Sequence, residues 1–154
     1  MRRTDRATGT EEALGILATA EYGVLSMASP DGEPYGIPLN FSFTDNCIYF
    51  HCAPDGRKTD IFAANSRVSF AVVGKTKVVP EQFGTEYESV VVSGVVQELF
   101  GAEKKDGLLA LISKYAPEHL QKGIRYIDTL FDKTKVFKIC VHTITGKACT
   151  QCTA

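Results

Sequence analysis

Apolar and polar residues alternate along several short segments of the chain, a period typical of half-buried β-strands. In the segment 47–52, Ile48 and Phe50 fall on one face, and Tyr49 and His51 fall on the other. The segment 67–74 is almost continuously apolar, which predicts a strand buried on both faces. The remaining predicted strands cover 24–28, 35–44, 87–99 and 135–142, which makes six in all.

Helical spacing of apolar residues interrupts this pattern in three places. It predicts a helix after Thr10 that ends before Gly23, a short helix over 59–64, and a longer one over 102–115 that Pro117 stops. The stretch from there to Leu130 is ambiguous.

The succession of strands joined by turns predicts a mainly β fold, an antiparallel barrel with flanking helices. Gly94 lies in the middle of a long Val-rich strand and predicts a bend or bulge there. The glycine-rich fingerprints of dinucleotide-binding sheets and of P-loops are absent from the sequence. The 154 residues suffice for one domain, with 1–9 and 149–154 expected to be flexible ends.

Composition narrows the range of partners. Apolar residues make up 44% of the chain, charged residues 23%, and the net charge is −1. This gives no excess of positive charge for nucleic acid or an anionic membrane, so we expect neither as a partner. No segment reaches the roughly 20 apolar residues of a membrane span, and no apolar stretch after the basic start completes a signal peptide, so we expect a cytoplasmic protein.

Five cysteines with irregular spacing indicate reduced thiols rather than a disulfide framework. Cys149 and Cys152 have the two-residue spacing of redox and zinc motifs. A structural zinc site needs four ligands, and the sequence offers no second pair at a fitting distance. We therefore expect no bound metal.

The segment with the best chemistry for an anion is Gly56-Arg57-Lys58-Thr59, which joins a strand end to a helix start. Backbone N–H groups at a helix start and basic side chains together favour a phosphate. A solvated surface loop is the alternative reading of the same residues.

Two further positions are open to more than one reading. Pro38 inside a strand-like run indicates an edge or a bulge, where Asn40 could meet the edge of a heterocycle, or else a plain edge strand. His51 has the chemistry for proton transfer, but it could equally be a structural histidine.

Seven segments in the same order resemble the pyridoxamine 5′-phosphate oxidase-like flavoproteins, and most closely their nitroimidazole-reductase branch. These segments are AEYGVLS (20–26), DGEPYGIPLNF (31–41), IYFHCA (48–53), GRK (56–58), RVSF (67–70), YESV (87–90) and ITGKA (144–148).

The resemblance implies a six-stranded split β-barrel that forms a homodimer, with FMN in a cleft between the subunits. It assigns Arg57 and Lys58, with Thr59 beside them, to the FMN phosphate. The other implied cofactor contacts are Leu39, Asn40, Phe41, Tyr87, Ser89 and Lys147, the last of them from the partner subunit.

For the activity, the resemblance implies reduction of a small electron-poor acceptor such as a nitroimidazole, with His51 beside the substrate face of the flavin. The alternative is a module that holds flavin, or haem, without turnover. No counterpart of the arginine-rich C-terminal signature of the true oxidases is found, so oxidation of vitamin B6 is not expected.

Overall fold

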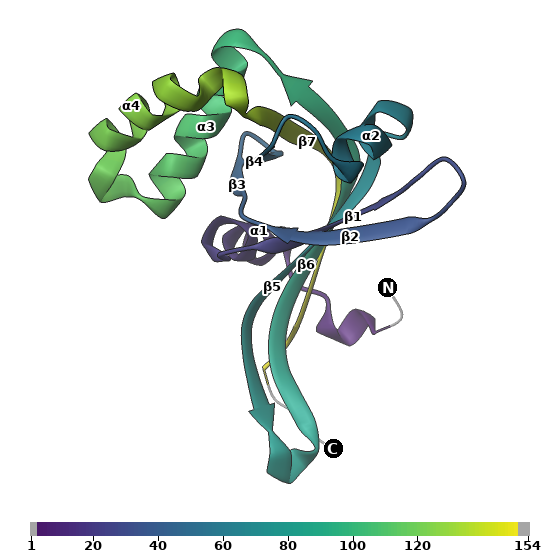
Figure 1. The fold of residues 1–154 in the computed structure, drawn as a ribbon. Helices are drawn as coiled ribbons and strands as arrows, with labels where there is room; N and C mark the ends of the chain where they lie inside the picture. The colour runs from purple at the N-terminus through teal and green to yellow at the C-terminus, as the bar shows by residue number, and fades with distance from the viewer. Residues whose placement is uncertain (1–2, 151–154) are drawn as a thin grey trace.

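The computed structural model describes residues 3–150 as a curved β-sheet with helices around it (Figure 1). The seven strands are β1 (Gly23–Ala28), β2 (Pro34–Leu39), β3 (Ser42–Thr44), β4 (Cys47–Cys52), β5 (Arg67–Val79), β6 (Gly84–Leu99) and β7 (Lys135–Cys149). The α-helices are α1 (Thr10–Thr19), α2 (Arg57–Ala64), α3 (Gly101–Tyr115) and α4 (Leu120–Leu130). Short 3-10 turns, η1 to η4, lie at Thr4–Arg6, Pro80–Gln82, Pro117–His119 and Phe131–Lys133.

All pairings between neighbouring strands are antiparallel, in the order β2-β1-β5-β6-β7-β4-β3. The sheet curls into a barrel whose two edge strands, β2 and β3, follow one another in the chain. The expected mainly β split barrel with flanking helices is therefore confirmed.

The predicted number of six strands is wrong, because the expected strand 35–44 divides in two at Asn40 and Phe41. The hydroxyl of Tyr115, at the end of α3, accepts a hydrogen bond from the Phe41 N–H at 3.0 Å and lies 2.9 Å from the Phe41 carbonyl. A side chain 74 positions away thus takes the backbone groups that a continuous strand would use.

The sheet is also longer than the sequence pattern predicts. β5 continues to Val79 and β6 begins at Gly84, so the two strands form a hairpin arm that extends away from the barrel, with η2 at its tip (Figure 1). Exposed apolar side chains mark this arm, and Phe83 is fully exposed. The ambiguous stretch before Leu130 is the helix α4.

The expected bend at Gly94 is confirmed by a shift in the pairing of β6 with β7 between Ser93 and Gly94. A Cβ atom at Gly94 would run into the carbonyl oxygen of Cys140, so the close approach of the two strands requires glycine here.

The barrel interior is filled by the inward faces of the strands. Ile48 and Phe50 are wholly buried, whereas His51 is exposed on the other face of β4, as the alternation predicts. Phe50 stacks on Phe137 with 5.6 Å between ring centroids, and Phe62 from α2 packs against both rings.

At the chain ends, Ala7 forms a β-bridge with Lys147, and Cys149 is buried as the last residue of β7. Flexibility of 1–9 and 149–154 remains a prediction, and residues 1, 2 and 151–154, including Cys152, lie outside the described residues. None of the helices within 3–150 has the length and apolar character needed to cross a membrane.

Candidate functional site

The first turn of α2 carries the predicted anion-binding residues. The helix begins at Arg57, two residues earlier than the sequence predicts, so Arg57 and Lys58 belong to the helix start rather than to a loop. Gly56 precedes it with φ of 148°, a conformation that favours glycine. No side chain caps the helix, because the N-cap residue is Gly56, and the Thr59 hydroxyl donates to the Gly56 carbonyl at 2.6 Å. The Thr59 N–H also donates to the Gly56 carbonyl at 2.9 Å, so the N–H groups of Arg57 and Lys58 are the ones left without a capping partner.

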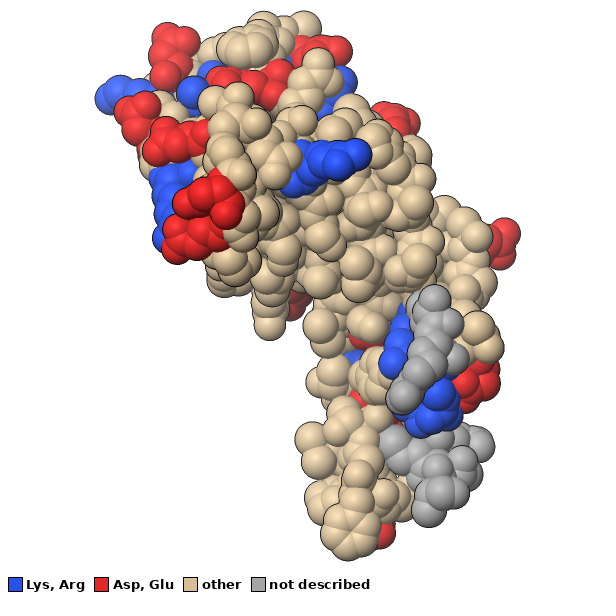
Figure 2. Space-filling view, turned by 90° about the vertical axis from the view of Figure 1, so that its right-hand side faces the viewer, with Lys and Arg blue, Asp and Glu red and all other residues tan. Residues whose placement is uncertain are grey.

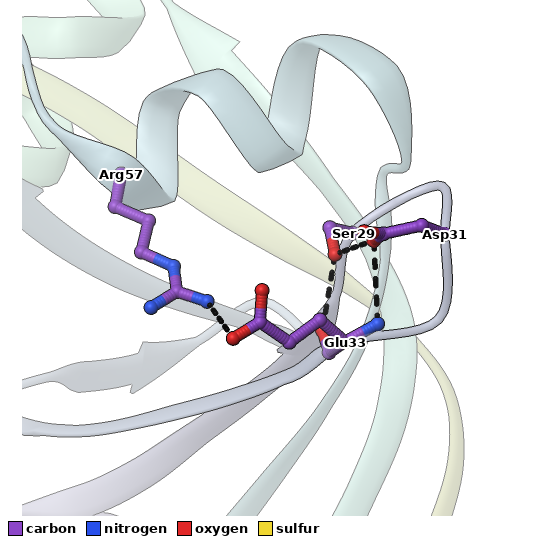
Figure 3. Close-up of polar contacts among 4 residues, drawn as sticks. All are labelled: Ser29, Asp31, Glu33 and Arg57. Carbon is purple, nitrogen blue, oxygen red and sulfur yellow. Dashed lines mark hydrogen bonds and ion pairs between the residues drawn. The ribbon is translucent and has the colours of Figure 1, made fainter.

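The Arg57 side chain reaches the turn between β1 and β2 (Figure 3). Its Nη2 atom lies 2.9 Å from Oε1 of Glu33, and its guanidinium lies 4.6 Å above the ring of Tyr35. Ser29, in the same turn, hydrogen-bonds Asp31 and the Glu33 carbonyl, which fixes the position of Glu33. A groove of about 380 Å³ lies between this turn and α2.

Lys58 points toward the end of β4. Although part of the His51 side chain is exposed, its place against α3 and α4 removes water from the imidazole, and this desolvation is the main cause that lowers its pKa below the ordinary value; the positive charge of Lys58 lowers it further. Burial raises the pKa of the neighbouring Cys52 thiol, and Lys58 opposes that rise. At pH 7 the lowered pKa favours the neutral imidazole, in which one ring nitrogen donates a hydrogen bond and the other accepts one.

The strip 39–41 lies where β2 gives way to β3. Leu39 ends β2, and the exposed Asn40 donates from Nδ2 to the Glu21 carbonyl at 3.1 Å, which leaves its amide oxygen available. The Phe41 side chain is wholly buried against Phe70.

A second group of predicted residues lies on the outer face of the sheet near the arm. Ser89 pairs with Lys147 in the register of β6 and β7, and the Ser89 hydroxyl donates to the Lys147 carbonyl at 3.4 Å. The Lys147 ammonium lies 5.5 Å from the centre of the Tyr87 ring. A hydrogen bond from Lys147, supported by Arg6, lowers the pKa of Tyr87.

These two groups lie at opposite ends of β1. At one end, Asn65 after α2 donates to the Ala28 carbonyl at 2.9 Å. At the other end, Gly23 pairs with Val72, and Ser89 pairs with the next residue, Val73. The five residue steps of β1 cover about 16 Å. One copy of the chain therefore does not gather all of the predicted site residues around one ligand.

The sequence pattern missed three residues that shape the site. Glu33 and Tyr35 hold Arg57 in place. The only feature of the sequence that could have predicted this contact is the negative charge of Glu33 in the preceding hairpin. No pattern in the sequence pointed to Lys114 as a residue of this region. Its ammonium lies 3.8 Å from the centre of the Phe41 ring without a hydrogen-bond partner in the described structure, and burial lowers its pKa to about 8.

Within residues 3–150 there is no group of three or more His, Cys, Asp or Glu side chains that could hold a metal ion.

Residues 9–148 match the family model described as pyridoxamine 5′-phosphate oxidase. No curated protein sequence gives a significant match.

Several solved structures share the fold. A candidate 5-nitroimidazole antibiotic resistance protein from Bacteroides thetaiotaomicron is 22% identical, with a TM-score of 0.75 over 92% of this chain and 86% of that chain. An FAD-binding protein from Mesorhizobium loti is 25% identical, with a TM-score of 0.68 over 94% and 98% of the two chains. An FAD- and haem-binding protein from Mycobacterium smegmatis is 15% identical, with a TM-score of 0.79 over 95% and 74%.

Proposed function

The chain belongs to the pyridoxamine 5′-phosphate oxidase family, and from this premise we propose that it binds FMN with the phosphate at the start of α2. The observation that carries the proposal is the uncapped first turn of α2 with Arg57 and Lys58 in it. The helix dipole and the free N–H groups favour an anion, and two basic side chains add charge-assisted hydrogen bonds.

The residues present fit a flavin phosphate. Lys58 has no carboxylate partner within residues 3–150, so its charge is available. Arg57 shares its guanidinium with Glu33 at the surface, where about half of each side chain or more is exposed. Such a pair contributes only about 0–1 kcal/mol, so a phosphate can replace the carboxylate. When bound, FMN would supply the chemistry of electron transfer.

We further propose that the site is completed by a second copy of the chain. Two cross-strand rows on the outer face of the sheet contain no charged residue. They are Pro38–Val24–Ala71–Val91–Thr145 and Gly36–Ser26–Ser69–Ser93–Thr143. The view in Figure 2 shows a broad region with few charged side chains across the middle of the molecule.

A two-fold axis through this face supports one site formed by both subunits. If the axis lies in the interface and crosses the strands, it sets the Ser89 end of one sheet against the α2 end of the other. Tyr87, Ser89 and Lys147 of one subunit would then face the Arg57 and Lys58 of its partner.

Ala71→Glu is expected to convert this homodimer to a monomer, because it places a carboxylate in the middle of the uncharged rows, where a partner would bury it. Sedimentation velocity over a concentration series measures the change, with a rise of at least 100-fold in the dimer dissociation constant. Ala102→Glu adds the same charge in the exposed first turn of α3 and should leave the dimer intact. A dimer of unchanged affinity in folded Ala71→Glu would contradict this interface.

For the activity, we propose an FMN-dependent oxidoreductase that reduces a small electron-poor acceptor such as a nitroimidazole. The lowered pKa of His51 favours the neutral imidazole at pH 7, and the position of His51 near Lys58 supports a role in hydrogen bonding the acceptor. The test is a visible spectrum of the purified protein after FMN is added, followed by anaerobic reduction with dithionite and addition of a nitroimidazole. Reoxidation of the flavin is the expected result. A reduced flavin that stays reduced would contradict the reductase but leave FMN binding intact.

The alternative is a flavin- or haem-binding module without turnover. The specific support for it is the fold shared with the FAD- and haem-binding protein of Mycobacterium smegmatis. A Soret band after addition of haemin, with no flavin uptake, would favour this alternative.

A further inference from the structure

The helices α3 and α4 form a hairpin that stands beside the barrel, away from the arm of β5 and β6 (Figure 1). Two adjoining hollows follow this hairpin. A partly open one of about 160 Å³ lies between α3, α4 and His51 of β4, and its other lining residues include Leu108, Leu111 and Leu130. An open groove of about 460 Å³ continues between the end of α3 and α4. Ile112 and Tyr126 line both, so the two hollows meet there.

The floor of the open groove is apolar. Ile112 of α3 and Ala116, which directly follows α3, form one side, and the ring of Tyr126, which is 65% exposed, forms part of the other. At Gly123 the two helices are in close contact, because a Cβ there would lie 2.7 Å from Ile112 side-chain atoms. The tight contact between Gly123 and Ile112 thus closes the bottom of the groove, next to the exposed ring of Tyr126.

The rim of the groove carries one sign of charge. Lys122 and Arg125 line it together with His119, and no carboxylate does. The nearby acid of α4, Asp128, is paired with Lys105 of α3 at 2.9 Å. Neither Lys122 nor Arg125 has an ion pair with any group in residues 3–150. Although the whole chain has a net charge of −1, the groove is thus lined by two basic side chains that no carboxylate in residues 3–150 neutralises through an ion pair.

We propose that this groove binds an amphipathic carboxylate, with its acid group between Lys122 and Arg125 and its hydrocarbon part over Ile112 and Tyr126. The planar guanidinium of Arg125 can hold a carboxylate through two hydrogen bonds, and Lys122 adds a point charge. The apolar end of the ligand enters the smaller hollow beside Leu108 and Leu111. The open groove and its charges lie apart from Arg57 and Lys58 and do not depend on FMN binding, whereas the adjoining hollow shares His51 with the proposed acceptor site.

Calorimetric titration of the full chain with straight-chain carboxylates tests the proposal. From butanoate to octanoate, each added methylene should strengthen binding about fourfold, since each leaves water for an apolar surface. The double variant Lys122→Gln, Arg125→Gln should weaken octanoate binding at least tenfold. The matched control Lys75→Gln, Lys77→Gln removes two charges from the arm and should bind octanoate as the wild type does.

A second variant tests the groove by shape. Ala116→Trp fills the floor and should abolish octanoate binding while leaving FMN uptake unchanged. Three results would each overturn the proposal: no octanoate binding to the wild type at millimolar concentration, equal binding by the folded charge variant, or equally tight binding of octylamine. Loss of FMN uptake with intact octanoate binding would count against the α2 site alone.

Discussion

Lys58→Glu is expected to raise the dissociation constant of FMN by about 30- to 900-fold. The substitution removes a charge-assisted hydrogen bond to the phosphate and adds repulsion at the helix start, together about 2–4 kcal/mol. Fluorescence titration of free FMN measures this change directly, because binding alters the emission of the flavin. An unchanged dissociation constant in the folded variant would remove Lys58 from the phosphate site.

Two companion variants separate this local effect from a change in overall charge. Lys133→Glu alters net charge by the same amount at an exposed position in η4 and should leave FMN affinity near that of the wild type. Glu33→Gln removes the carboxylate that competes for Arg57 and should strengthen FMN binding up to about fivefold, the range of an exposed ion pair. If the FMN phosphate binds here, Lys58→Glu should weaken FMN binding and Glu33→Gln should strengthen it.

Phe50→Ala is expected to lower the free energy of unfolding by about 3–5 kcal/mol. Phe50 is wholly buried, stacks on Phe137 and meets the edge of Phe62, so its removal leaves a cavity that three elements border. Urea denaturation followed by circular dichroism gives the change in midpoint and slope.

The matched control is Phe83→Ala at the tip of the arm. The Phe83 side chain is fully exposed, so its truncation should change the free energy of unfolding by no more than about 0.5 kcal/mol. Equal losses in the two variants would contradict the assignment of Phe50 to the interior of the barrel.

Local pattern was sufficient for much of the barrel. Alternation along 47–52 predicted which side of β4 faces inward, because successive side chains in a strand point to opposite faces whatever its partners are. The bend at Gly94 was likewise predictable from one residue, since a glycine inside a long strand often marks a bulge or a bend. The ordered segments that resemble a known family led to the same family as the match over residues 9–148.

Other features were decided by contacts between distant parts of the chain. The division of 35–44 into β2 and β3 depends on the hydroxyl of Tyr115, and the restraint on Arg57 depends on Glu33 in another hairpin. The separation of Ser89 from Arg57 follows from the register of β1 against β5, which no local pattern encodes.

The sequence by itself thus determined most of the strands, the inward face of 47–52 and the basic residues beside a helix start, because these depend on neighbours within a few residues. Only the tertiary structure decided the length of the arm, the environment of His51 beneath α3 and α4, and the distance between the two groups of site residues. Each of these depends on cross-strand pairing and on packing between segments far apart in the chain. The residues of one segment do not show which distant segments it will pair with or pack against.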